Sequence, residues 1–129
     1  MSDYNSEKNR FVWVDIPVDD LGRACAFYEG VLGCGVHRES IGEMEFGVLD
    51  HHEGNGGCLL PRDEVSGTGA GGVLVYLNVD GRIRDAAAKV GELGGKVTTA
   101  VHAIGPHGFR AVIEDSEGNT MALHSNTDA

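Results

Sequence analysis

Alternating apolar positions mark the first regular element of the chain. Val12, Val14, Ile16 and Val18 recur at every second position, in a segment rich in β-branched and aromatic residues. This period predicts a strand over residues 11–18, with one face buried under a helix. Residues 11, 13, 15 and 17 then belong to the opposite face of the sheet.

The period changes to that of a helix after residue 20. Apolar side chains from Leu21 to Leu32 share one helical face. Asp19 or Asp20 stands where an N-cap is needed, and Gly33 stands where a left-handed C-cap is needed. Three short strands are predicted near residues 36–39, 44–49 and 57–60.

The second half of the chain repeats this order of elements. We predict a strand over 73–79, a helix from Ile83 to Leu93 with Asp80 as its cap, and strands near 96–101, 109–115 and 120–125. At an offset of 61 residues Gly33 aligns with Gly94, and at an offset of 64 residues 53–55 align with 117–119. Such a repeat predicts an α+β fold of two tandem β-α-β-β-β units, whose open sheet faces cover each other or enclose a ligand.

Length and composition fit one domain built in this way. The chain has 129 residues and an ordinary apolar fraction of 41%, which is enough for a single core. We expect a flexible tail over residues 1–10 and one domain over 11–125. The domain consists of unit one (11–61), a linker (62–72) and unit two (73–125).

The charge balance restricts the possible partners. There are 10 basic and 20 acidic residues, for a net charge of −10, which argues against binding to nucleic acids or to an anionic membrane. No apolar run reaches the roughly 20 residues that span a bilayer, and the polar N-terminus predicts a cytoplasmic protein. The three cysteines have no metal-type spacing, so we expect neither a zinc site nor a disulfide framework from them.

Three sequence segments carry a resemblance to a known family. They are D-L-x-R-A-x-x-F-Y-x-x-V-L-G at residues 20–33, V-D…A-x-x-K-V-x-x-L-G-G-K-V at 79–97, and D-x-E-G-N-x-x-x-L-H-S at 115–125. Over residues 11–125 the chain resembles the vicinal oxygen chelate superfamily, which groups glyoxalase I, extradiol dioxygenases, epimerases, and fosfomycin-resistance and bleomycin-binding proteins. The resemblance implies an open, curved mixed-sheet barrel and a homodimer.

The resemblance also implies where a metal ion would be held. Relatives place His and Glu ligands in the first and last strands of each unit, and the matching positions here are Trp13, Cys58, Leu74 and Ala122. Trp, Leu and Ala offer no suitable lone pair, and one thiol cannot complete such a site. We therefore predict that the metal site is absent and that the protein has no cofactor.

Strand alternation predicts which side chains line the concave face. The candidate catalytic residues are Asp15, Tyr76 and His124. The candidate ligand-binding residues on this face are Trp13, Cys58, Leu74, Asn78, Thr120 and Ala122. His107 and Arg110 are further candidates from the segment G-P-H-G-F-R, where a role in a hairpin loop is the open alternative. Aromatic walls with sparse polar groups are typical of a small-molecule pocket, and Arg110 has the planar fork that binds anions. Structural roles are open alternatives: Trp13 can fill space, Tyr76 can pack, and His124 can bond to the backbone.

Four functions follow as alternatives. The first is a metal-free binding protein for a small organic or partly aromatic compound. The second is a metal-independent lyase or isomerase that uses Asp15, Tyr76 or His124 for proton transfer. The third is a metal-dependent glyoxalase- or dioxygenase-like enzyme with relocated ligands. The fourth is a structural or regulatory subunit whose pocket is vestigial.

Overall fold

The computed structural model describes residues 9–65 and 72–129. The chain divides into two compact units, each with one helix. We call them the α1 unit, Val14–Leu74, and the α2 unit, Met1–Trp13 with Val75–Ala129. Most of the predicted tail and residues 66–71 of the predicted linker lie outside the described residues.

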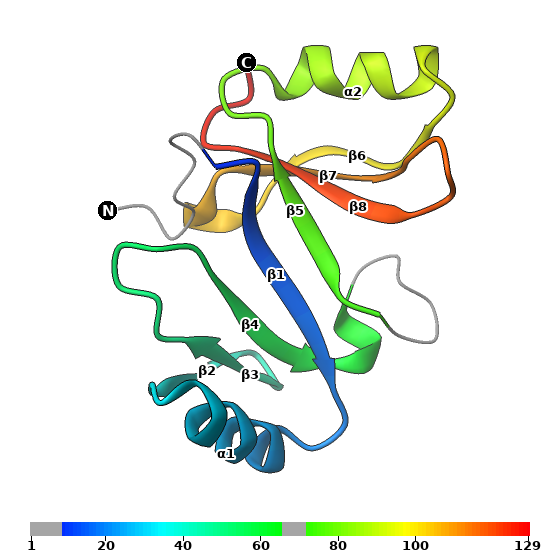
Figure 1. Cartoon of the computed structure of the whole chain (residues 1–129). Coiled ribbons are helices and arrows are strands. Elements are labelled where there is room, and N and C mark those ends of the chain that lie inside the picture. Colours follow the sequence, from blue (N-terminus) through cyan, green and yellow to red (C-terminus); the bar gives the residue numbers. More distant parts are fainter. Residues whose placement is uncertain (1–8, 66–71) are drawn as a thin grey trace. The chain divides into compact units, whose positions relative to one another are not determined.

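The α1 unit carries α1 (Leu21–Leu32) on a mixed set of strands (Figure 1). Its strands are hydrogen-bonded in the order β2-β3-β4-β1. They are β1 (Phe11–Val18), β2 (Val36–Ile41), β3 (Met44–Leu49) and β4 (Gly56–Pro61), and a 3₁₀ turn, η1 (Arg62–Glu64), follows β4. The β2-β3 and β3-β4 pairs are antiparallel.

Both ends of α1 follow from the local sequence. The Asp20 carboxylate accepts the Arg23 backbone N–H at 3.0 Å, which is the N-cap bond of the first turn. Gly33 ends the helix at φ 66°, where its backbone N–H donates to the Glu29 carbonyl. A residue with a Cβ is strained in this left-handed conformation. The predicted helix and both of its caps are confirmed.

The α2 unit repeats this arrangement with α2 (Ile83–Glu92). The strands are hydrogen-bonded in the order β5-β8-β7-β6, with the start of β1 beside β5, where Asn78 N–H donates to the Arg10 carbonyl at 2.7 Å. They are β5 (Leu74–Asn78), β6 (Lys96–Ala103), β7 (Phe109–Glu114) and β8 (Thr120–Ser125), with a 3₁₀ turn, η2 (Gly105–His107), before β7. The β5-β8 pair is parallel and the other two pairs are antiparallel. The predicted α+β fold class is confirmed.

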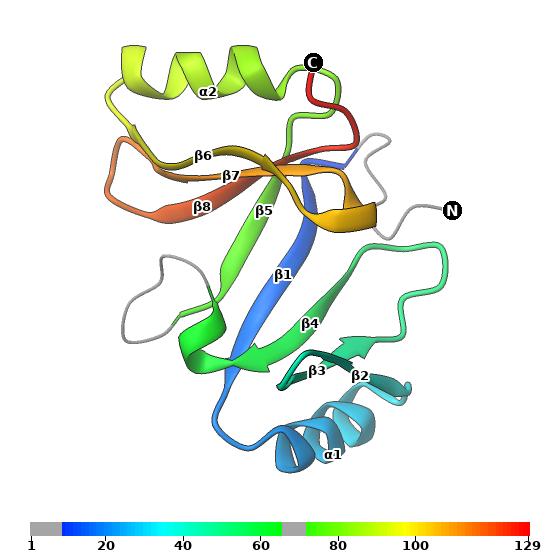
Figure 2. The same ribbon diagram turned by 180° about the vertical axis from the view of Figure 1, so that it is seen from behind.

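The core of the α2 unit lies between α2 and one face of these strands (Figure 2). Ile83 and Ala86 of α2 pack on Ala111, Ile113 and Leu123, and all five are buried. Leu77 and Val79 pack against the same cluster, as strand alternation predicts. Burial of a side chain the size of Ile83 contributes about 1.5–3 kcal/mol.

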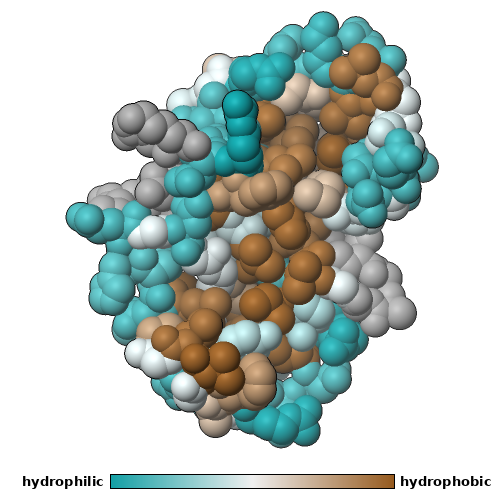
Figure 3. Space-filling view, viewed as in Figure 1, coloured by the Kyte–Doolittle hydropathy of each residue, from teal (hydrophilic) through white to brown (hydrophobic). Residues whose placement is uncertain are grey.

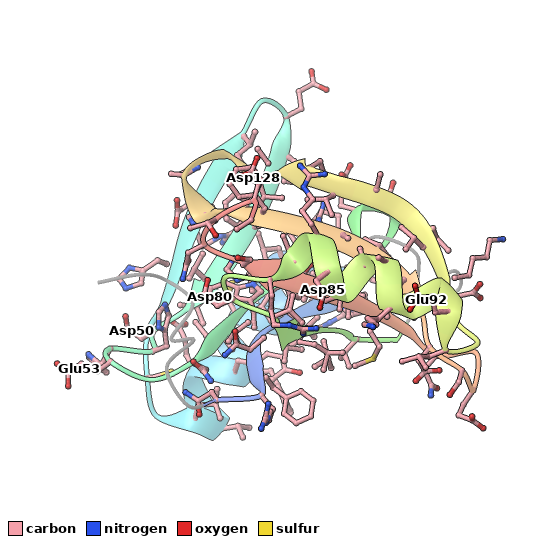
Figure 4. All side chains as sticks on the ribbon, turned by 90° about the horizontal axis from the view of Figure 1, so that it is seen from above. Asp50, Glu53, Asp80, Asp85, Glu92 and Asp128 are labelled. Carbon is pink, nitrogen blue, oxygen red and sulfur yellow. The ribbon has the colours of Figure 1, made fainter. Side chains whose placement is uncertain are left out.

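The outer sides of the two helices differ. In α2, ion pairs join Arg82 to Asp85 at 2.7 Å and Lys89 to Glu92 at 3.7 Å, and the two acidic side chains extend from the helix in Figure 4. In α1 only one residue is buried, and apolar atoms reach the surface there (Figure 3). The exposed apolar residues of α1 are Phe27, Val31 and Leu32.

Asp80 has a different role from the predicted helix cap. Arg82 occupies the N-cap position of α2 and makes no side-chain capping bond. The Asp80 carboxylate instead accepts the Asn126 backbone N–H at 2.7 Å and the Ser125 hydroxyl at 3.3 Å. The reason is that Gly81, at φ 78°, turns the chain before the helix begins. Donors at the end of β8 are therefore closer to Asp80 than those of α2.

The strand register repeats between the two units. Cys58 pairs with Val48 in the α1 unit, and Ala122 pairs with Val112 in the α2 unit. Each pair is related to the other by the offset of 64 residues predicted from the sequence. The alignment that equates Cys58 with Ala122 is therefore confirmed.

No helix within the described ranges combines the length and the apolar character that crossing a membrane requires.

Candidate functional site

Four polar side chains form a row across the α2 unit. The register pairs His102 of β6 with Arg110 of β7, Arg110 with His124 of β8, and His124 with Asn78 of β5. Directly paired residues point to the same face of a sheet. The four residues therefore share one face, which we call the polar row.

The polar row lies on the face turned away from α2. The preceding or following residues on the same strands, Val101, Ala111, Leu123 and Leu77, belong to the core under the helix or pack against it. Successive side chains on a strand point to opposite faces. The predicted concave-face positions 78 and 124, and the candidate ligand residue Arg110, thus lie together on one surface of this unit.

Arg110 is the centre of a hydrogen-bond chain in this row. Its Nη1 donates to the Tyr76 hydroxyl oxygen at 2.8 Å, and its Nε donates to His102 Nε2 at 3.3 Å. His102 Nδ1 lies 2.8 Å from the Ala100 carbonyl oxygen, which can only accept. His102 therefore carries its hydrogen on Nδ1 and offers the Nε2 lone pair to Arg110.

The two hydrogen-bond acceptors of Arg110 in the described part of the chain, His102 and Tyr76, are neutral side chains. Within residues 9–65 and 72–129, no Asp or Glu forms an ion pair with this half-buried guanidinium. A guanidinium stays protonated in proteins, and burial without an anion is unfavourable. No ion pair in the described residues therefore compensates the positive charge of Arg110.

His124 is fully buried beside Arg110 in the register. Its Nε2 lies 2.7 Å from the His107 carbonyl oxygen and donates to it. Burial lowers the pKa of His124, and the His107 carbonyl and the Asp80 carboxylate only partly oppose this. His124 is therefore neutral near pH 7 and adds no second positive charge next to Arg110.

Because it has no Cβ, Gly108 allows its backbone segment to lie close to the His124 ring. Its φ is 91°, and a Cβ at this position would lie 2.5 Å from the Ser125 carbonyl oxygen and 3.3 Å from His124 Nε2. His107, in the η2 turn just before it, contributes its backbone carbonyl to this contact. Ligand binding by the His107 side chain stays a prediction.

Asn78 and Thr120 have positions that the sequence does not reveal. The Asn78 amide donates to the Asn9 carbonyl at 2.6 Å and accepts from the Asp80 backbone N–H at 3.0 Å, so it holds together two chain segments. Thr120 begins β8 opposite Glu114, at the other end of the strand from His124. Their binding roles stay predictions.

The α1 unit contains a buried thiol–carboxylate pair. Cys58 Sγ donates to Asp15 Oδ1 at 3.1 Å, and the two residues are only 7% and 4% exposed. Sequence reasoning did not find this partner for Cys58. The offsets relate the pair to the other unit, because Asp15 aligns with Tyr76 and Cys58 with Ala122, and the structure shows Tyr76 and Ala122 as a register pair.

A cavity of about 410 Å³ opens elsewhere in the α1 unit. It combines apolar side chains with carboxylates, and none of the predicted site residues lines it. Arg62 forms an ion pair with Asp19 at its edge and lowers the pKa of that carboxyl group. Its lining consists of Val18, Asp19, Leu21, Glu43, Met44, Glu45, Pro61 and Glu64. An acidic lining disfavours anionic ligands.

The match to a protein-family model spans both repeated units. Residues 10–123 match the family described as the Glyoxalase/Bleomycin resistance protein/Dioxygenase superfamily. The chain belongs to this superfamily. The resemblance inferred from the three sequence segments is thereby confirmed. No curated protein matches the sequence significantly.

Several solved structures share the fold at low sequence identity. A hypothetical protein from Bacillus halodurans C-125 has a TM-score of 0.70 and 14% identity, covering 95% of this chain and 98% of that chain. Methylmalonyl-CoA epimerase from Mycobacterium tuberculosis has a TM-score of 0.67 and 18% identity (90% and 87% covered). A Streptomyces coelicolor methylmalonyl-CoA epimerase, in complex with 2-nitronate-propionyl-CoA, has a TM-score of 0.65 and 21% identity (94% and 99% covered).

The four positions that the resemblance matches to metal ligands do not offer suitable donors for a divalent cation. Trp13 and Ala122 of the α2 unit, and Cys58 and Leu74 of the α1 unit, are all buried. Three of them offer no lone pair for a metal, and the Cys58 thiol hydrogen is held by Asp15. No group of three or more His, Cys, Asp or Glu side chains in the described part of the chain is arranged to hold a metal ion.

Proposed function

We propose that this superfamily member binds a small organic anion and that Arg110 is the residue that anchors it. The observation that carries the proposal is the half-buried guanidinium whose hydrogen-bond acceptors, Tyr76 and His102, are both neutral. A carboxylate on the ligand would supply the missing charge and accept two parallel N–H bonds. Trp13 and Tyr76, in the same unit, favour a partly aromatic compound.

The test compares benzoate with its uncharged analogue benzamide. Isothermal titration calorimetry on the full chain should give a measurable affinity for benzoate and at least a tenfold weaker one for benzamide, because a charged hydrogen bond contributes about 1.5–3 kcal/mol. Equal affinities for the two compounds would contradict the proposal.

Two variants locate the binding site. Arg110→Gln should lower the affinity for benzoate by about ten- to a hundredfold, since it removes the charge and the fork. Arg38→Gln is the matched control, because it removes the same charge from the exposed strand β2 of the other unit. Arg110→Lys keeps the charge but not the fork, and we expect it to recover only part of the affinity.

A second candidate is a metal-independent lyase or isomerase. It is favoured by the buried Asp15 carboxylate, which Cys58 holds in place and which can take up a proton from an acidic C–H group. The resemblance in fold to two methylmalonyl-CoA epimerases suggests an acyl-thioester probe. The test is exchange of the α-hydrogen of methylmalonyl-CoA with deuterium from D₂O, followed by NMR. We expect exchange with the wild type and none with Asp15→Asn, and no exchange with the wild type excludes this candidate.

The predicted homodimer also remains a proposal. Sedimentation equilibrium measures it directly, because a dimer has twice the 13.6 kDa chain mass. A single species with the mass of one chain contradicts it.

A further inference from the structure

His102 is the polar-row residue to which the sequence assigned no role. It lies in β6 directly opposite Arg110, and its side chain is half-buried. Its two ring nitrogens are both engaged, one with the Ala100 carbonyl and one with Arg110 Nε. These two contacts determine which group donates in each hydrogen bond that links Ala100, His102, Arg110 and Tyr76.

The assignment of donors and acceptors starts from a backbone carbonyl group. The Ala100 carbonyl oxygen can only accept, so the hydrogen of neutral His102 lies on Nδ1 and the lone pair on Nε2. Nε2 therefore accepts from Arg110, and Arg110 in turn donates to the Tyr76 oxygen. Because that oxygen receives the Arg110 hydrogen, the hydroxyl hydrogen of Tyr76 points away from the guanidinium.

A carboxylate in place of His102 would have a different effect. It would accept from Arg110 equally well, but it would also neutralise the guanidinium charge. The chain has twice as many acidic as basic residues, yet a neutral acceptor stands at this position. His102 thus orients the Arg110 side chain without neutralising its positive charge.

We infer that His102 is a positioning residue that determines the ligand class of the Arg110 site. By fixing the guanidinium through a neutral acceptor, it leaves the remaining N–H groups of Arg110 as charged donors. The matching ligand group is an anion that only accepts hydrogen bonds, such as a carboxylate or an enolate. A neutral alcohol or amine does not meet this requirement. The inference rests on the proposed function, because it concerns the same Arg110 site.

Three substitutions of His102 separate orientation from charge. In His102→Gln the side-chain carbonyl can accept from Arg110 Nε without adding charge, so the affinity for benzoate should stay within about twofold of the wild type. In His102→Leu the acceptor is lost, and the affinity should fall about tenfold. In His102→Glu the new carboxylate pairs with Arg110, and the preference for benzoate over benzamide should disappear.

The matched control is His37→Leu. His37 lies in β2, the edge strand of the α1 unit, as His102 lies in β6, the edge strand of the α2 unit. This variant should bind benzoate like the wild type. The ¹⁵Nε–¹H NMR signal of Arg110 provides a second readout, because it should be sharp and shifted in the wild type and His102→Gln and should lose that shift in His102→Leu, without any ligand.

The outcomes distinguish the two proposals. If Arg110→Gln abolishes benzoate binding while His102→Leu and His102→Glu bind like the wild type, the positioning role of His102 is overturned and the proposed function stands. If Arg110→Gln binds benzoate like the wild type, the proposed function itself is overturned. Graded loss in the order Gln, Leu, Glu at position 102 supports both.

Discussion

The two units share a pattern of elements but differ in what their strands carry at matching positions. In the α1 unit, Asp15 accepts a hydrogen bond from buried Cys58. In the α2 unit the matching residues are Tyr76 and Ala122, and Tyr76 receives its hydrogen bond from Arg110 instead. The apolar face of each strand set is bound to its helix and cannot change without loss of the core. The other face does not pack against a helix, so its side chains differ between the units although Asp15, Cys58, Tyr76 and Ala122 are all buried.

The two helices also differ in how much of their apolar surface is buried. In α2, Ile83 is fully buried and ion pairs occupy the outer side. In α1, Cys25 is the only buried residue, and Phe27 and Val31 are 59% and 65% exposed. A helix that exposes large apolar residues obtains less stabilisation from its packing. The comparison therefore predicts that the α2 unit is more sensitive to substitution.

The largest effect is expected at the helix–sheet contact of the α2 unit. Ile83→Ala leaves a cavity in the core and should lower the free energy of unfolding by about 2–5 kcal/mol. Val31→Ala in α1, where the side chain is mostly exposed, should change it by about 0.5 kcal/mol or less. Urea unfolding followed by circular dichroism measures both values, and similar losses would remove the distinction between the helices.

The turns before β3 and β7 provide the next comparison. Gly108→Ala places a Cβ against the Ser125 carbonyl at a positive φ, and we expect a loss of about 2–4 kcal/mol. Gly42 also has a positive φ, at 60°, but a Cβ there meets nothing within 4 Å. Gly42→Ala should therefore cost only about 1 kcal/mol. Thermal unfolding of both variants tests this difference, which fails if Gly42→Ala is the more damaging change.

The Asp15–Cys58 hydrogen bond is tested against a second buried cysteine. Cys25 and Cys58 are 6% and 7% exposed, so their replacement by Ala removes similar packing. Only Cys58→Ala also takes a hydrogen-bond donor from a buried carboxylate, and it should cost about 1–3 kcal/mol more than Cys25→Ala. Cys58→Ser should recover most of this difference. Equal losses for the two Ala variants would mean that the bond has no net effect on stability.

The smallest effect is the pH dependence due to His124. Because burial lowers its folded-state pKa below 6.5, the unfolded chain binds a proton first as the pH falls. The stability contribution is complete above about pH 6.5 and is lost towards the folded-state pKa, with a slope of at most about 1.4 kcal/mol per pH unit. The lowered pKa values of Asp19, Asp50 and Asp115 contribute stability that is lost as the pH falls from about 5, at the acidic end of this window.

His124→Gln isolates this effect. Gln can still donate to the His107 carbonyl, but it does not titrate. Unfolding curves at several pH values between 4.5 and 8, a range of about two units around the ordinary pKa of His, should show a flatter profile for the variant. An unchanged slope would assign the pH dependence to other groups.

Local sequence determined most of the secondary structure. The alternation at Val12, Val14 and Ile16 is sufficient for β1, and the side chain of Asp20 and the missing Cβ of Gly33 are sufficient for the ends of α1. These features depend on residues within one turn or one strand. The repeat offset adds long-range information, because the order of residues alone equates Cys58 with Ala122, and the strand register agrees.

Tertiary structure alone decided which polar groups meet. Asp80 suits a helix cap by its sequence, yet it bonds to residues 45 and 46 positions away. Tyr76 and Arg110 form a hydrogen bond although they are separated by 34 positions. No periodicity in the sequence indicates that one ring nitrogen of His102 contacts the Ala100 carbonyl and the other contacts Arg110. Hydrogen bonds of this kind depend on the register between strands and on side-chain direction to within a few tenths of an ångström. Hydrophobic pattern indicates which face of a strand packs under its helix, but it does not specify those distances, nor that Trp13 and Asp15 of β1 are also buried.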